Sequence, residues 1–266
     1  MTLELNTTKM LAEVNDGIGW ITFNQPEKRN AINLEMAVAL GDILEHFQRS
    51  DEVRVVVMRG AGGKAFVAGA DISEFKEKRS NAVQKAEYAK VTERGYGWLE
   101  KLDKPLIALI EGFCIGGGLA TALSADVRFA SPDSTFGVPA AKLGLGYGFD
   151  GIAKLAELVG PSTAKDIMFS ARFLTAEEAL SKRLINFVVE RGEIQQHVHD
   201  YASRIAGNAP LTVKAAKAAL TEYSKAPQER DLKKLRAMVD ACFNSEDYQE
   251  GIRAFGEKRK PNFKGR

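Results

Sequence analysis

The stretch KPLIALIEGFCIGGGLATALSADV (residues 104–127) combines a buried strand, a glycine-rich turn and the start of a helix. Residues 106–110 form a short apolar run, typical of parallel sheets covered on both faces. Three glycines at 116–118 follow, before a helix expected at 119–124. Glycine lets the backbone approach a ligand, and the free N–H groups of a first helical turn attract negative charge. The turn therefore predicts either an oxyanion site or a tight contact between helix and sheet.

The same arrangement occurs earlier in the chain. The apolar run at 54–59 leads into GAGGKAFVAGADISEF (residues 60–75). A thioester carbonyl that becomes an enolate or a tetrahedral oxyanion needs two convergent N–H donors, each worth ~3 kcal/mol. The two glycine loops together predict such a pair of donors. The spacing of the glycines at 116–118 is not the dinucleotide fingerprint, and it lacks the Lys-Ser/Thr of a phosphate loop.

Strands and helices alternate along most of the chain, which predicts an α/β fold built from βαβ units. The expected elements are a hairpin at 10–14 and 18–23 turning at Asn15-Asp16-Gly17, a helix at 34–47 capped by Asn33, a strand at 54–59, a helix at 81–102, strands at 125–129 and 184–189, and a capping box at Thr175 and Glu178. From about residue 195 onward the sequence is helical. We expect a core at 1–194 and a helical subdomain at 195–266.

Composition excludes several classes of function. The 37 basic and 35 acidic residues leave a net charge of +2, which is no footprint of a nucleic-acid binder. Two cysteines, Cys114 and Cys242, and three scattered histidines argue against a disulfide framework and against a metal site. The N-terminus is unlike a signal peptide, and no apolar run reaches the ~20 residues that span a bilayer. We expect a cytoplasmic protein without a membrane segment.

Three motifs carry a family resemblance. FVAGADISEF (66–75), IEGFCIGGGLATALSADVRFA (110–130) and FGVPAAKLGLGYGFDGIAKLAELVG (136–160) resemble the crotonase, or enoyl-CoA hydratase/isomerase, superfamily. The likeness runs from NQPEKRNAIN (24–33) to FGEKRKPNF (255–263).

This resemblance implies a spiral ββα core with a C-terminal helical trimerisation region, and assembly into homotrimers or homohexamers. It also implies an acyl-CoA substrate, with coenzyme A as part of that substrate and no other cofactor. The oxyanion hole of the superfamily falls on the backbone N–H groups of Ala70 and Gly117.

The chain departs from the superfamily pattern at two positions. Hydratases carry one glutamate two residues after the glycine run and another after the proline of the FGxP segment, where this chain has Ala120 and Ala140. A methyl group can neither orient a water nor carry a proton. We therefore do not expect the usual two-carboxylate addition of water. The isomerases usually keep the second glutamate, so double-bond isomerisation is disfavoured too.

Two polar side chains remain in the third motif. Asp150 is the only carboxylate of FGVPAAKLGLGYGFDG, and it is a candidate acid/base or water-orienting group. The alternative is an N-cap of the helix that follows. Tyr147 is a candidate hydrogen-bond donor to the acyl group or the thioester, and its alternative is an aromatic residue at the rim of the site.

The resemblance also implies contacts to coenzyme A. The expected residues are Lys28 and Arg29 near the phosphates, Ala68, Asp71 and Ile72 beside the first loop, and Phe255 and Lys258, which in the superfamily commonly come from a neighbouring subunit. Lysine and arginine suit phosphate, although ordinary surface solvation is the alternative for each. Asp71 has a second reading as a helix cap.

We expect an enzyme that processes an acyl-CoA and stabilises a thioester oxyanion or enolate. By overall similarity, this enzyme would be named an enoyl-CoA hydratase/isomerase. With both glutamates replaced, thioester hydrolysis, decarboxylation and carbon–carbon cleavage remain open. A non-catalytic acyl-CoA binder and an RNA-binding member of the superfamily are alternatives of another class.

Overall fold

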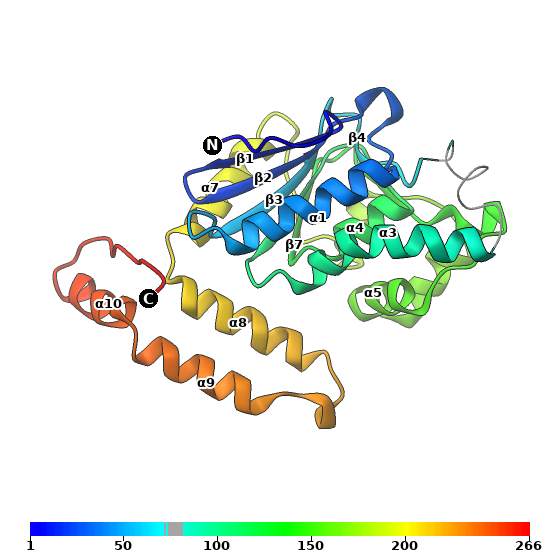
Figure 1. Cartoon of the computed structure of the whole chain (residues 1–266). Coiled ribbons are helices and arrows are strands. Elements are labelled where there is room, and N and C mark those ends of the chain that lie inside the picture. The colour runs from blue at the N-terminus through cyan, green and yellow to red at the C-terminus, as the bar shows by residue number, and fades with distance from the viewer. Residues whose placement is uncertain (72, 74–81) are drawn as a thin grey trace.

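The computed structural model describes residues 1–71, 73 and 82–266, and shows a layered α/β body with a helical arm (Figure 1). Its described strands form two sheets, with strand orders β1-β2-β3-β5-β7-β10 and β4-β6-β8-β9. The first comprises β1 (Met10–Asn15), β2 (Ile18–Phe23), β3 (Val55–Gly60), β5 (Leu106–Ile110), β7 (Val127–Ala130) and β10 (Phe187–Val188). The second comprises β4 (Ala65–Val67), β6 (Phe113–Ile115), β8 (Thr135–Gly137) and β9 (Leu174–Thr175).

The predicted hairpin and buried strand are both present. β1 pairs with β2 in antiparallel register, with Asn15 opposite Ile18, and the turn residues Asp16 and Gly17 have φ angles of 51° and 79°. Two left-handed residues match the twist of a two-residue hairpin. β3 is parallel to both of its neighbours, β2 and β5, and its first four residues are buried. Burial on both faces explains why this run is continuously apolar.

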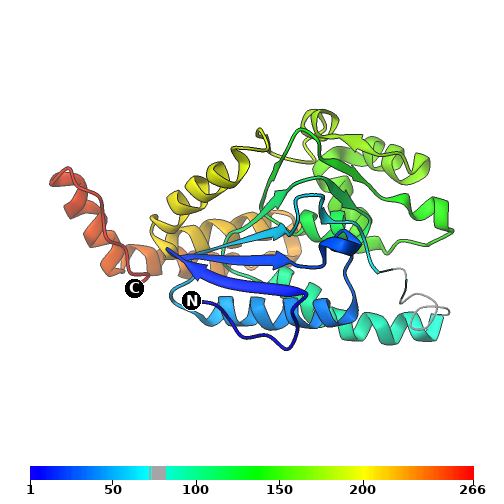
Figure 2. The ribbon, with the colours of Figure 1, turned by 90° about the horizontal axis from the view of Figure 1, so that it is seen from above.

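Helices cover both faces of the six-stranded sheet (Figure 2). They are α1 (Leu34–Arg49), α3 (Ala82–Lys101), α4 (Gly117–Leu123), α5 (Phe149–Ser170), α6 (Ala176–Ser181), α7 (Ile194–Ala206), α8 (Pro210–Tyr223), α9 (Leu232–Phe243) and α10 (Glu246–Gly256), with short 3-10 turns η1 (Pro26–Lys28), η3 (Pro139–Leu143) and η4 (Pro227–Glu229). Along β3, Val56 and Met58 face α1 and α3, whereas Val55 and Val57 face α7.

Two helix starts match the capping signals in the sequence. The side chain of Asn33 accepts a hydrogen bond of 2.9 Å from the N–H of Met36 at the start of α1. At α6, the Thr175 hydroxyl accepts from the Glu178 N–H, and the Glu178 carboxylate accepts from the Thr175 N–H. Both predicted caps are therefore confirmed.

Each of β3, β5 and β7 leads directly into a strand of the smaller sheet, namely β4, β6 and β8. A helix follows the second such pair at once, because α4 begins two residues after β6. This succession of two strands and a helix brings the turn after β4 and the turn after β6 to the same side, since β4 and β6 are parallel neighbours. The two glycine loops are thereby placed together.

The C-terminal helices α8, α9 and α10 form an arm that projects from the layered body (Figure 1). The last ten residues return along α10. Asp247 accepts from the N–H groups of Lys264 and Gly265, and Arg54 of the body donates to the carbonyl of Phe263 at 2.6 Å. The tail therefore links the arm to the body.

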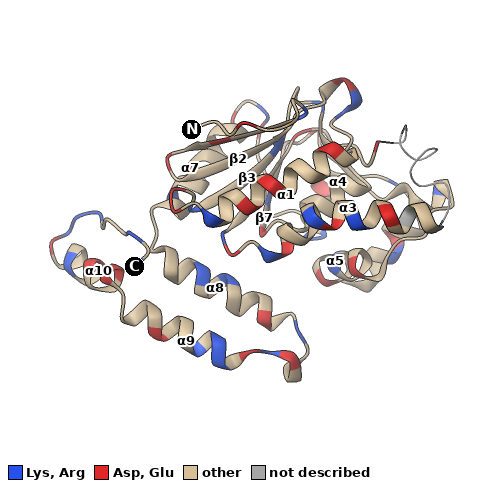
Figure 3. Ribbon diagram, in the orientation of Figure 1, with Lys and Arg blue, Asp and Glu red and all other residues tan. Residues whose placement is uncertain are grey.

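Acidic and basic residues are interspersed along the ribbon (Figure 3). Within the described ranges, no cluster of three or more His, Cys, Asp or Glu side chains is arranged to hold a metal ion. None of the described helices is both long enough and apolar enough to cross a membrane.

Candidate active site

Ala70 lies in the loop after β4, and its N–H is aimed by a bond on the other side of the same peptide. The carbonyl of Gly69 accepts a hydrogen bond of 2.8 Å from the N–H of Ile32. Because the C=O and N–H of a planar trans peptide point in opposite directions, the Ala70 N–H points away from Ile32. No acceptor for this N–H lies among the described residues. The donor is therefore open to a ligand.

Gly117 is the first residue of α4, and its N–H is oriented by the same principle. The carbonyl of Gly116 accepts a 3.0 Å bond from the N–H of Ala120, so the Gly117 N–H points backward out of the helix. Gly116 is held in turn by a 2.8 Å bond from its N–H to the carbonyl of Gly137. In the part of the chain that the structure describes, the Gly117 N–H has no partner.

The three consecutive glycines have different roles. A methyl group on Gly118 would collide with the carbonyl of Val67, and Gly116 has φ 55° and ψ −118°, a conformation that favours glycine. A methyl group on Gly117 would instead lie 3.6 Å from the nitrogen of Ala70, an ordinary contact. Packing thus explains Gly118 and backbone conformation explains Gly116. Gly117 has room, and it lies beside the other donor.

Asp71 follows Ala70 and is buried, with 7% of its surface exposed. Its carboxylate accepts hydrogen bonds from Lys28 Nζ at 2.7 Å, from the Ser73 hydroxyl at 2.6 Å and from the Ser73 N–H at 3.0 Å. Burial alone would raise the pKa of Asp71, but these bonds outweigh it and lower the pKa to about 2. The carboxylate is therefore charged at neutral pH.

Arg29 and Ala68 also lie at this loop. The Arg29 carbonyl accepts a 3.0 Å bond from the Ala68 N–H, and its guanidinium stacks over the ring of Phe113 at 4.8 Å. Ile72 lies outside the described residues. The structure thus brings Lys28, Arg29, Ala68 and Asp71 to the loop that carries Ala70.

Sequence reasoning missed Asn30, which is fully buried and left-handed, with φ 56°. Its amide donates to the carbonyls of Ala61 and Ala65 and accepts from the N–H of Gln25. The available signal was an asparagine between Arg29 and an apolar run, because asparagine tolerates left-handed backbone better than most residues.

Ala120 and Ala140 stand on α4 and η3. Ala120 is half-buried, and Ala140 is 4% exposed within the main core cluster. Neither methyl group can accept a proton or orient a water.

Tyr147 is half-buried and packs against the main core, close to Gly151 at the start of α5. Asp150 is exposed. The N-cap of α5 is Gly148, so Asp150 lies inside the first turn and the N-cap prediction for it is wrong. A carboxylate in a first turn still interacts favourably with the helix dipole.

Phe255 and Lys258 do not join the loops within one chain. Phe255 is 88% exposed on α10, Lys258 follows that helix, and α10 lies at the far end of the arm from α4 (Figure 1).

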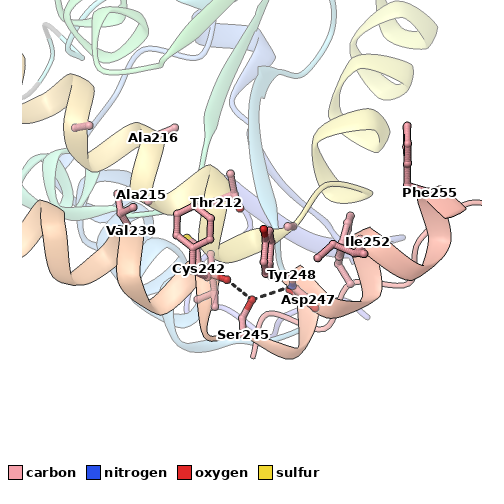
Figure 4. Close-up of a pocket in the computed structure, with 16 residues that line it drawn as sticks. Thr212, Ala215, Ala216, Val239, Cys242, Ser245, Asp247, Tyr248, Ile252 and Phe255 are labelled. Carbon is pink, nitrogen blue, oxygen red and sulfur yellow. Dashed lines mark hydrogen bonds between the residues drawn. The ribbon is translucent and has the colours of Figure 1, made fainter.

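An apolar groove of about 820 Å³ lies on the arm rather than at the loops (Figure 4). Its walls come from α8, α9 and α10 and from the tail, and include Ala215, Val239, Phe243, Tyr248, Ile252 and Phe255. It holds neither of the two open N–H donors.

Comparison with known proteins gives a family match over nearly the whole chain. The model of the enoyl-CoA hydratase/isomerase family matches residues 13–266. The short-chain-enoyl-CoA hydratase of Clostridium acetobutylicum is 36% identical over 99% of this chain and 100% of its own length. The crotonyl-CoA hydratase of Syntrophomonas wolfei is 33% identical over 96% of this chain and 97% of its own length.

Solved structures agree. The crystal structure of an enoyl-CoA hydratase/carnithine racemase from Magnetospirillum magneticum matches with a TM-score of 0.92 and 34% identity, and covers 98% of this chain and 97% of its own. The predicted α/β fold of crotonase type is therefore confirmed.

Proposed function

This chain belongs to the enoyl-CoA hydratase/isomerase family, and we propose that it binds an acyl-CoA thioester with the carbonyl oxygen between the N–H groups of Ala70 and Gly117. The observation that carries the proposal is the pair of adjacent, unpartnered N–H donors, each fixed through the carbonyl of its own peptide. Donors that are already oriented stabilise a developing oxyanion without reorganisation, at ~3 kcal/mol each. The chain is an enoyl-CoA hydratase-like enzyme.

The reaction that suits this site best is one that needs no protein base at the α-carbon. In decarboxylation of an acyl-CoA with a carboxylate on that carbon, the electron pair of the breaking carbon–carbon bond enters the enolate and CO₂ leaves. A proton from water then restores the α-carbon. The two N–H groups stabilise the enolate oxygen, and Ala120 and Ala140 place no charged group beside the departing carboxylate.

Hydration is the second candidate, because the relatives from Clostridium acetobutylicum and Syntrophomonas wolfei are named hydratases. It would require another group to hold the water, and Asp150 or Tyr147 is the available choice on the third motif.

A substrate panel distinguishes these reactions. Release of CO₂ from malonyl-CoA or methylmalonyl-CoA supports decarboxylation, and loss of the enoyl chromophore of crotonyl-CoA supports hydration. Free thiol, measured with a thiol reagent, reports hydrolysis. Binding without any turnover supports an acyl-CoA binder, and an RNA affinity that falls steeply with salt supports the RNA-binding alternative. Failure to bind any acyl-CoA contradicts the proposal.

We also infer that the chain forms a homotrimer or a homohexamer. The apolar groove on the arm supports this assembly, since a contiguous exposed apolar surface marks an interface. Phe255 and Lys258 are then close to a coenzyme A bound by a neighbouring subunit. Light scattering gives the mass, and Ile252→Glu in the groove is expected to lower it. A monomeric wild type contradicts the assembly.

A further inference from the structure

Lys28 and Asp71 are both expected from the resemblance to contact coenzyme A, but in the structure they contact each other. Their ion pair is 2.7 Å long, with 48% of the Lys28 side chain and 8% of the Asp71 side chain exposed. A carboxylate 2.7 Å from the ammonium offsets its charge and so weakens its attraction for a phosphate. The pair therefore needs another explanation.

The pair lies at the end of a backbone ladder that holds the Ala70 loop. Residues 68–71 are bonded to residues 29–32 by three hydrogen bonds of 2.8–3.0 Å: Ala68 N–H to Arg29 C=O, Ile32 N–H to Gly69 C=O, and Asp71 N–H to Ile32 C=O. The middle bond aims the Ala70 N–H. The third bond and the ion pair both act on Asp71, the residue directly after Ala70.

The segment that carries Lys28 is anchored by hydrogen bonds. It ends in two left-handed residues, Arg29 and Asn30, and the buried Asn30 amide bonds the carbonyls of Ala61 and Ala65. Gly69, by contrast, has φ 103°, and glycine resists rotation of the neighbouring peptide less than other residues do. The peptide with the Ala70 N–H is held on one side by the bond to the Gly69 carbonyl and on its far side at Asp71.

We propose that the Lys28–Asp71 ion pair is a positioning device that holds the Ala70 N–H toward Gly117, and that Lys28 is not a phosphate ligand. This inference rests on the proposed function, because it assumes that the Ala70 N–H binds a thioester carbonyl. Neither residue touches the reacting atoms. Both act through the peptide beside them.

The test uses a probe that reports on the carbonyl itself. Butyryl-CoA labelled with ¹³C at the thioester carbon is bound to the full-length protein, and its carbonyl resonance and Kd are measured. Butyryl-pantetheine with the same label lacks the nucleotide and all its phosphates. Hydrogen bonds to the oxygen polarise the carbonyl and move its resonance downfield, so the wild type is expected to show this shift with both probes.

Positioning predicts that Lys28→Gln and Asp71→Asn each lose most of the downfield shift with both probes. The double variant loses no more than either single one, because the two side chains act as a unit. Lys28→Arg retains the shift. The matched control is Lys9→Gln, which breaks the 2.6 Å Lys9–Glu35 pair away from the loop and is expected to leave the shift unchanged.

A phosphate role predicts a different pattern. Lys28→Gln would weaken the binding of butyryl-CoA by about fivefold, leave the binding of butyryl-pantetheine unaffected and keep the carbonyl shift. Asp71→Asn would remove the carboxylate that offsets the charge of Lys28, and would tighten the binding of butyryl-CoA. That pattern overturns the positioning role. Absence of the shift in the wild type overturns the proposed oxyanion hole, and with it this role. Circular dichroism verifies folding. If Asp71→Asn does not fold, the comparison of Lys28→Gln with Lys28→Arg decides between the positioning role and the phosphate role.

Discussion

Gly118 lies against the carbonyl oxygen of Val67 so closely that a methyl group on its Cα would collide with that oxygen. The contact presses α4 onto β4 and thereby brings the first turn of α4 to the loop that carries Ala70. Packing at one glycine thus sets the position of the donor on the preceding residue, Gly117.

This contact predicts opposite outcomes for neighbouring glycines. Gly118→Ala is expected to lower the free energy of unfolding by ~1–3 kcal/mol through overpacking. Gly117→Ala meets only ordinary contacts and is expected to leave stability unchanged or raise it by less than ~1 kcal/mol, because alanine loses less entropy than glycine in a helix. Urea unfolding measures both. Equal destabilisation by the two changes would contradict the packing role.

Gly117→Pro is expected to lower turnover strongly without unfolding the protein. Proline is well tolerated at the first position of a helix, but it has no N–H to donate. Loss of one oxyanion donor lowers kcat by ~100-fold to 1,000-fold. Gly117→Ala, which keeps the N–H, is the matched control. Unchanged activity in a folded Gly117→Pro protein would refute the role of this donor.

The two donor loops could be predicted from the sequence because each follows a buried apolar strand, and parallel strands deliver their following turns to one edge. The Lys28–Asp71 pair could not be predicted in this way. Its partners lie 43 residues apart, and their meeting depends on the crossing between η1 and the loop after β4. No local sequence pattern indicates a contact between residues that are so far apart in the chain.

Asp150 shows a different limit of prediction from sequence. The sequence YGFDGIAK offers no strong capping residue apart from Asp150, so the aspartate is the natural choice of N-cap. The helix begins earlier, at Phe149 behind the extended Gly148, because glycine is also tolerated at an N-cap. Tyr147, directly before this N-cap, packs against the core, a tertiary contact that no local capping pattern indicates.

The missing carboxylates give a test by restoration. The wild type is expected to hydrate crotonyl-CoA poorly or not at all, and Ala120→Glu with Ala140→Glu should raise that rate if the surrounding geometry is that of a hydratase. The matched control, Ala120→Gln with Ala140→Gln, has similar size but no base, and is expected to stay inactive. Efficient hydration by the wild type would show that other groups orient the water.

The low pKa of Glu250 predicts how the stability of the arm depends on pH. Hydrogen bonds from Arg259 and Arg253, and from the N–H of Asn262, hold the pKa of Glu250 well below its ordinary 4.5. A carboxyl group whose pKa is lower in the folded protein than in the unfolded chain stabilises the fold. This stabilisation is fully present when the pH is above the pKa of the unfolded chain, and it is lost as the pH falls through about 4.5 toward the pKa of the folded protein.

The melting temperature of the wild type should therefore fall more steeply below about pH 5 than that of Glu250→Gln, which has no such proton to take up. Glu246→Gln on the same helix, where the carboxylate is exposed, is the control and should follow the wild-type curve. Parallel curves for the wild type and Glu250→Gln would contradict this account.

Asp150 provides the sharpest test of acid/base chemistry on the third motif. Asp150→Asn keeps the size of the side chain and removes the basic group, so a role in proton transfer predicts a loss of ~100-fold or more in kcat with little change in melting temperature. Because Asp150 lies inside the first turn of α5 rather than at its N-cap, Asp150→Ala should lose only the dipole interaction, ~0.3–1 kcal/mol. Glu157→Gln, on the same helix and also exposed, is the control for the loss of a negative charge. Near-wild-type kcat in Asp150→Asn would exclude Asp150 as the acid/base. Proton transfer would then fall to Tyr147 or to water, and water is the proton source in the decarboxylation proposed for the Ala70 and Gly117 donors.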